Sequence, residues 1–77
     1  MNKEILSERL EIDLDCIGIG RTKLIYDDYM VSKFEDNYDM AVNGYGRFVH
    51  LNKKAVIKKI LQIEDAKVRT ENHDWAI

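Results

Sequence analysis

Apolar and polar residues alternate in the first part of the chain, which is typical of a strand with one buried face. Leu10, Ile12 and Leu14 are separated by carboxylates, so the apolar side chains of such a strand would share one side. Gly18 and Gly20 follow and indicate a bend before the next segment. The sequence therefore predicts a half-buried strand that ends near Cys16, which would be buried as a small hydrophobe.

Further strands are predicted from residue 21 onward. Residues 21–26 resume the alternation, and residues 29–34 are rich in β-branched and aromatic side chains. The Asn43-Gly44 pair lies between the apolar runs 38–42 and 45–51 and suits the two positive-φ positions of a type I′ turn. These features predict a hairpin.

In that hairpin Val42 would face Tyr45.

The same region has a second interpretation, because Met30, Phe34 and Tyr38 also recur every four residues ahead of Val42. A helix over residues 28–42 stays open as the alternative to strands.

A helical spacing dominates the C-terminal third of the chain. Asn52 is a good N-cap, and apolar residues recur behind it at one helix face: Val56, Ile57, Ile60, Leu61 and Ile63. The spacing predicts a helix over about 53–66, whereas residues 3–9 carry only a weak helical pattern. The expected fold class is α+β, with a small antiparallel meander, including the Asn-Gly hairpin, packed against this C-terminal amphipathic helix.

Length and cysteine content limit the organisation of the chain. Its 77 residues allow one domain with a small core, and residues 69–77, with the lone Trp75, are expected to form a loosely ordered tail. Cys16 is the only cysteine, so no internal disulfide forms and a cytoplasmic location is expected. No apolar run is long enough for a spanning helix or a signal peptide, and no membrane partner is expected.

Residue types that carry catalysis or bind metals are scattered. Cys16, His50 and His73 lack metal-ligand spacing, and no nucleophile motif accompanies the Cys16–His50 pair. We therefore expect no catalytic residues, no metal site and no cofactor, and we expect that the chain is not an enzyme.

Charge is segregated along the chain, and this segregation is the main functional signal. Residues 26–39 hold five carboxylates, one lysine and four aromatic rings. Exposed tyrosines with flanking charges are enriched at protein interfaces. The predicted acidic and aromatic face comprises Tyr26, Asp27, Asp28, Tyr29, Glu35, Asp36, Tyr38 and Asp39. The expected function is a protein-binding module or inhibitor that meets a basic partner surface, of the accessory type that phages and mobile elements encode.

Two alternatives compete with this function. Residues 40–59 hold five basic residues and no acidic ones, and they could contact nucleic acid phosphates: Arg47, Lys53, Lys54, Lys58 and Lys59. A sequence pI near 5.6 counts against that interpretation. The other alternative is a structural subunit that forms a homo-oligomer, since a core this small gives thin stability to a monomer.

Overall fold

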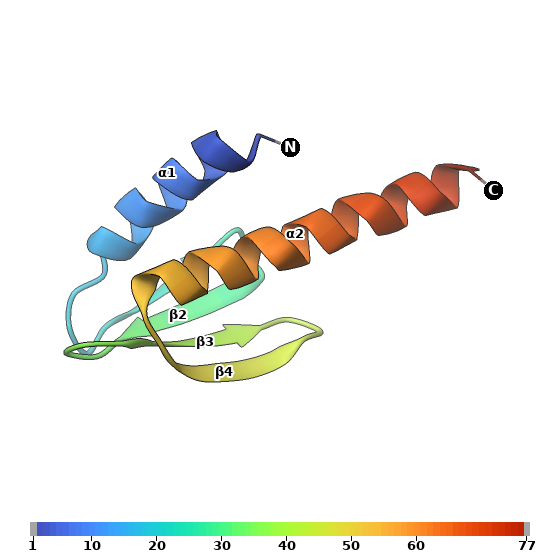
Figure 1. The fold of residues 1–77 in the computed structure, drawn as a ribbon. Coiled ribbons are helices and arrows are strands. Elements are labelled where there is room, and N and C mark those ends of the chain that lie inside the picture. The colour runs from blue at the N-terminus through green and yellow to red at the C-terminus, as the bar shows by residue number, and fades with distance from the viewer. Residues whose placement is uncertain (1, 77) are drawn as a thin grey trace.

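Four antiparallel strands form one sheet in the order β1-β2-β3-β4, and two helices lie on the same side of it (Figure 1). The computed structural model describes the backbone of residues 2–76 and the side chains of residues 2–67. The elements are α1 (Lys3–Asp15), β1 (Thr22–Ile25), β2 (Tyr29–Lys33), β3 (Tyr38–Val42), β4 (Gly46–Leu51) and α2 (Lys53–Ala76). The predicted α+β class, with a meander packed against the C-terminal helix, is confirmed.

The prediction of a strand over residues 10–16 is wrong, because this segment belongs to helix α1. Leu10 and Leu14 are four residues apart and both fully buried, while Ile12 is 63% exposed. The segment therefore buries one helical face through residues spaced four apart, and the alternation of apolar and polar residues did not reflect a strand. The Asn2 side chain caps the helix by accepting from the backbone N–H groups of Glu4 and Ile5, at 3.1 and 3.2 Å.

The strands over residues 22–51 confirm the predicted meander and exclude the alternative helix over 28–42. The predicted hairpin is present, but its turn differs. Val42 pairs with Gly46 rather than Tyr45, and the Tyr45 N–H donates to the Val42 carbonyl at 3.0 Å. Gly44 has a φ of 82°, whereas Asn43 has no positive φ, so the turn is not type I′.

Strand β4 contains a β-bulge opposite β3. The register runs from Tyr38↔Leu51 to Met40↔Phe48, so β4 carries one residue more than β3 between these pairs. His50 adopts a positive φ of 57° there, and its N–H donates to the Asp39 carboxylate at 3.2 Å. Asp39 thereby satisfies a backbone donor that the bulge removes from the ladder.

Helix α2 begins where the sequence predicts and continues past residue 66 to Ala76. Asn52 caps it, because its side chain accepts from the Ala55 N–H at 2.8 Å. The side chains of residues 68–77 lie outside the described part of the chain. The expected loose tail over residues 69–77, which includes Trp75, therefore stays a prediction.

The core lies between the sheet and the two helices. Among residues 2–67, twelve apolar side chains are buried there: Leu10, Leu14, Ile17, Ile25, Tyr29, Val31, Tyr38, Met40, Val42, Val56, Ile60 and Ile63. Three residues of the predicted α2 stripe, Val56, Ile60 and Ile63, are among them, whereas its other two members, Ile57 and Leu61, are only half-buried. A core of this size is small, so each member contributes a large share of the stability.

Ile60→Ala should lower the free energy of unfolding by about 2–5 kcal/mol, because Ile60 is fully buried and its loss leaves a cavity. Chemical denaturation measures this change. The matched control is Ile5→Ala in α1, whose side chain is 55% exposed and should change stability by less than about 0.5 kcal/mol. Equal effects at the two positions would contradict the packing of α2 described above.

Candidate functional site

The side of the sheet that faces away from the helices carries an exposed apolar row. Leu24 pairs with Met30 and Met30 with Ala41, so the apolar row crosses β1, β2 and β3, and Arg47 continues it on β4 as a charged residue. Leu24 is 54% exposed and Met30 is 52% exposed. We call this surface the open face; it comprises Thr22, Leu24, Met30, Ser32, Asp39, Ala41 and Arg47.

Two shallow hollows on the open face share Met30 and Ala41. One, of about 260 Å³, extends to Leu24 and Asp27, and the other, of about 230 Å³, extends to Asp39 and Arg47. Both are smaller than the roughly 300 Å³ at which ligand pockets begin. Hollows of this size suit single side chains of a partner better than a substrate.

A strained turn borders the open face between β1 and β2. Tyr26 and Asp27 have φ values of 50° and 61°, a left-handed conformation that is costly for residues with a side chain. Tyr26 is 42% exposed, and Asp27 is also exposed. Tyr45 is exposed in the β3–β4 turn at the same end of the sheet, where the Asn43 N–H donates to the Asp28 carbonyl at 3.0 Å.

The eight residues predicted as one acidic and aromatic face do not lie together. Tyr29 and Tyr38 are core side chains, 0% and 5% exposed. Glu35 and Asp36 are exposed in the β2–β3 turn, at the opposite end of the strands from Tyr26 and Asp27. Strand alternation explains the separation, since it turns Tyr29 and Tyr38 to the side opposite Met30 and Asp39.

Acidic residues nevertheless surround the open face at both ends. Asp39 lies on the face and pairs with Arg47 at 3.3 Å. Asp27, Glu35 and Asp36 have no ion pair among residues 2–67, and we call these three the acidic rim. The surface is therefore apolar at its centre and negative at its ends.

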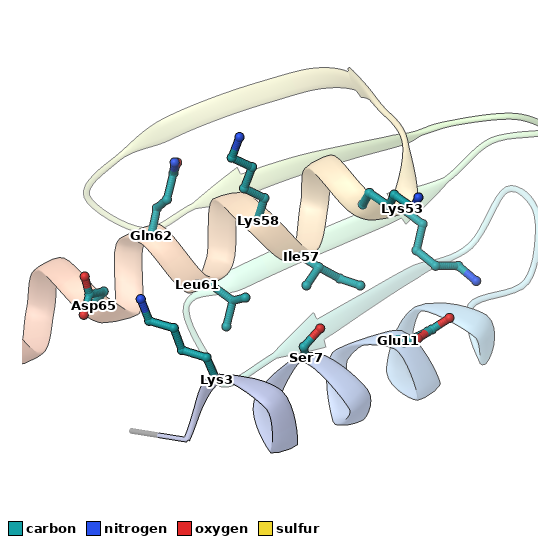
Figure 2. A pocket seen from close by; sticks show the side chains of 10 residues that line it. Lys3, Ser7, Glu11, Lys53, Ile57, Lys58, Leu61, Gln62 and Asp65 are labelled. Atoms are coloured by element: carbon teal, nitrogen blue, oxygen red, sulfur yellow. The ribbon is translucent and has the colours of Figure 1, made fainter.

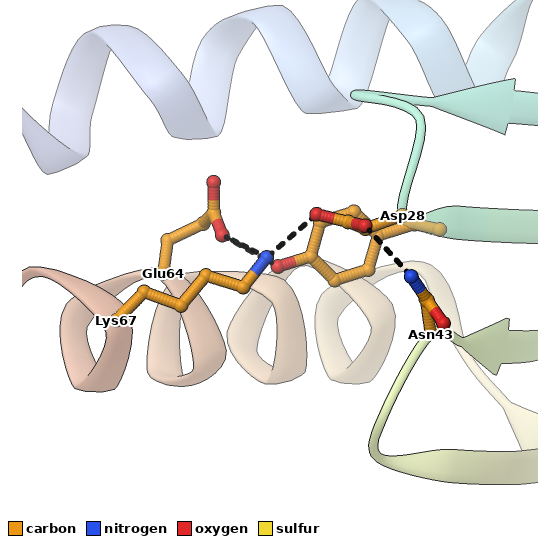
Figure 3. A network of polar contacts seen from close by, with 5 residues as sticks. Asp28, Asn43, Glu64 and Lys67 are labelled. Carbon is orange, nitrogen blue, oxygen red and sulfur yellow. Dashed lines mark hydrogen bonds and ion pairs between the residues drawn. The ribbon is translucent and has the colours of Figure 1, made fainter. Parts of the chain in front are cut away.

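A polar network ties the strained turn to α2 (Figure 3). The Tyr29 hydroxyl donates to Glu64 Oε2 at 2.7 Å, and Lys67 Nζ reaches both Glu64 at 3.2 Å and Asp28 Oδ2 at 2.8 Å. Lys67 also lies 5.3 Å from the centre of the Tyr29 ring. Asp28 accepts a longer bond from Asn43 at 3.5 Å. One lysine of α2 thus holds the β1–β2 turn, which in turn contacts the β3–β4 turn.

The network changes the acid–base behaviour of its members. The hydrogen bonds from Lys67 and Asn43 lower the pKa of Asp28 below its usual 3.8. The same bond to Asp28 raises the pKa of Lys67 above its usual range. Burial, followed by the bond to Glu64, raises the pKa of Tyr29, so that its hydroxyl stays protonated as a donor.

The basic residues predicted for nucleic acid contacts lie on three surfaces. Arg47 is on the open face, and Lys59 lies over the Phe48 ring, 4.8 Å from its centre. Lys53, Lys54 and Lys58 line a groove of about 770 Å³ between α1 and α2 (Figure 2). No strand residue lines this groove, so it opens on the side of the helices that faces away from the sheet.

The remaining candidates take part in no common site. Cys16 is exposed at the end of α1, so the expectation that it is buried is wrong, because the helix turns it away from the Leu10 and Leu14 face. His50 is an exposed residue of the β4 bulge, and the His73 side chain lies outside the described residues. Within the described part of the chain, no three His, Cys, Asp or Glu residues are placed to hold a metal ion.

Sequence reasoning missed the open face. A signal was present, because Leu24-Ile25 and Met30-Val31 are apolar at consecutive positions and a strand sends neighbouring side chains to opposite sides. It also missed Lys3, which only the packing of α1 brings to the groove.

Comparison with known proteins identifies no relative. No protein-family model matches the chain, and no curated protein or solved structure shows a significant match. None of the described helices has both the length and the apolar character needed to cross a membrane.

Tyr29→Phe should lower the free energy of unfolding by about 1–2 kcal/mol, because it removes the hydrogen bond to the Glu64 carboxylate but keeps the buried ring. Tyr26→Phe is the matched control, since the Tyr26 hydroxyl has no hydrogen bond with another described residue and its ring is partly exposed. Urea titrations of the three proteins provide the comparison. If both variants match the parent, the Tyr29–Glu64 bond contributes nothing to stability.

The stabilising effect of Asp28 should depend on pH. Because its pKa is lowered in the folded state, the unfolded chain takes up the proton first as the pH falls. Its contribution is therefore present above the unfolded value near 3.8 and is lost as the pH falls through the folded value. The stability difference between the parent and Asp28→Asn, followed by urea titration, should shrink as the pH falls below about 4.

The control for this pH dependence is the same comparison in a Lys67→Met background, where the main partner of Asp28 is missing. There, most of the pH dependence should disappear. A difference that stays constant with pH in the parent background would show that Lys67 does not hold the carboxylate.

Proposed function

We propose that the chain is a small, non-enzymatic protein-binding module that uses the open face of its sheet. The observation that carries the proposal is the continuous exposed row Leu24, Met30, Ala41, which crosses β1, β2 and β3. Single exposed apolar residues are common on protein surfaces, whereas contiguous apolar patches tend to mark interaction sites. Leu24, Met30 and Ala41 are direct cross-strand neighbours, so their exposed side chains form one contiguous apolar patch rather than three separate ones.

The chemistry of the surface defines the partner. An apolar centre favours apolar anchors that enter the hollows beside Met30 and Ala41. The acidic rim favours lysine or arginine around those anchors, and complementary charges of this kind mainly speed association. The partner is therefore a protein with an apolar patch flanked by basic residues. The carboxylates of residues 26–39 that face those basic residues are the three of the acidic rim.

The strained turn supports a role for this end of the sheet. Two consecutive left-handed residues with side chains cost free energy, and such strain clusters at functional positions. The network through Lys67 holds the turn in place, where Asp27 lines a hollow together with Leu24 and Tyr26 is exposed. Tyrosine is a frequent anchor at protein interfaces because its large ring is rigid and also forms hydrogen bonds. An exposed free Cys16 fits action in the reducing cytoplasm.

The test replaces Leu24 and Met30 together by serine. Both side chains are half exposed and outside the core, so the fold should persist while partner binding weakens at least about tenfold. The immobilised parent captures proteins from nuclease-treated lysate of the source cells. Each captured protein is then purified and titrated by calorimetry against the parent and the variant.

The matched control is the double variant Ile5→Ser and Ile12→Ser, which removes two equally exposed apolar side chains from α1 on the other side of the molecule. It should bind like the parent. Lysine at all three positions of the acidic rim should slow association and weaken its salt dependence. The proposal fails if the Leu24 and Met30 variant retains full affinity, or if capture depends on nucleic acid.

A further inference from the structure

The groove between α1 and α2 is a second surface, on the opposite side of the molecule from the open face. Its floor is formed by Ile57 and Leu61, one helical turn apart and half-buried. Figure 2 shows both side chains on the side of α2 that faces α1, with Lys3 reaching from α1 toward Asp65. Along α2 the groove runs from Lys53 to Asp65, roughly 18 Å at 1.5 Å per residue.

We propose that this groove binds an acidic amphipathic helix of a partner protein. Two neighbouring helices present a furrow into which a third helix packs its apolar ridge, with anchors at i, i+3 or i+4, and i+7. A length of roughly 18 Å corresponds to about 12 residues of such a helix. An extended peptide fits less well, because a groove made only of helices offers no strand edge to pair its backbone groups.

The charge of the groove indicates which charge the partner helix should carry. Lys54 and Lys58 are exposed on the α2 wall one turn apart, and Lys3 is exposed on the α1 wall. Lys53 is already paired with Asp15, and this contact raises the pKa of Lys53. Three exposed ammonium groups around an apolar floor complement carboxylates on the flanks of an apolar stripe.

The same lining argues against a nucleic acid as the occupant. Glu11 and Asp65 line the groove together with the lysines. A phosphate backbone is negative along its whole length and would meet the Glu11 carboxylate, whereas a mostly acidic helix can place a basic or neutral residue beside it. The apolar floor also gives phosphates nothing to contact. The inference does not depend on the open face, because the two surfaces share no residue.

The probe is a fluorescein-labelled synthetic peptide of about 14 residues, with leucine at i, i+4, i+7 and i+11 and glutamate on the flanking positions. Fluorescence anisotropy measures its affinity for the full chain, and circular dichroism checks that it becomes helical when bound. A scrambled peptide of the same composition keeps the charge and loses the apolar stripe. We expect the patterned peptide to bind at least about tenfold more tightly than the scrambled one.

Two variants of the chain test whether the peptide binds in the groove. Ser7→Trp puts a large ring over the floor from the α1 wall and should weaken binding at least about tenfold. The double variant Lys54→Gln and Lys58→Gln should weaken it about threefold to tenfold. Its matched control is Lys33→Gln with Lys59→Gln, which removes the same charge beside the Tyr38 and Phe48 rings and should leave affinity within about twofold.

Thermal melts confirm that each variant is folded before its affinity is interpreted. Equal binding of the scrambled peptide would reduce the effect to general electrostatics and overturn the proposal. So would full affinity in the Ser7→Trp variant, or the lack of any binding at millimolar peptide. An oligonucleotide or a second copy of the chain that occupies the groove in place of the peptide, detected by anisotropy and by sedimentation, would assign it to another partner and also overturn the proposal.

Discussion

The structure depends on one constraint, which is that both helices pack on the same side of the only sheet among the described residues. The buried apolar side chains lie between the helices and the sheet. The other side keeps half-exposed residues such as Leu24 and Met30. A two-layer fold of this size therefore presents one sheet surface to its surroundings, and the residues found there determine what the surface can bind.

The network around Lys67 joins the turns to the helix layer at one end of the sheet. Tyr29 contributes its ring to the core and its hydroxyl to Glu64, so a single residue belongs to both the apolar and the polar parts of the structure. Asp28 extends the contacts to the strained turn and to Asn43. This arrangement explains how two adjacent left-handed residues are retained in a small protein, since surrounding contacts must compensate for their conformational cost.

The two candidate surfaces are opposite in charge as well as in position. The open face has an apolar row with carboxylates at its ends, and the helical groove has an apolar floor with exposed lysines. The charge segregation along the sequence is kept only in part across the fold, because Lys53, Lys54 and Lys58 line the helical groove whereas Arg47 lies on the open face.

The sequence alone determined the elements whose signals are local. Asn52 and the stripe from Val56 to Ile63 specified the start and the buried face of α2, and turn residues with β-prone runs specified the meander. Residues 10–14 satisfied both a period of two and a spacing of four, and only packing against α2 and the sheet selected the helix. Tertiary structure also decided which tyrosines entered the core and brought Lys3 beside Leu61, because those outcomes depend on contacts between segments far apart in the chain.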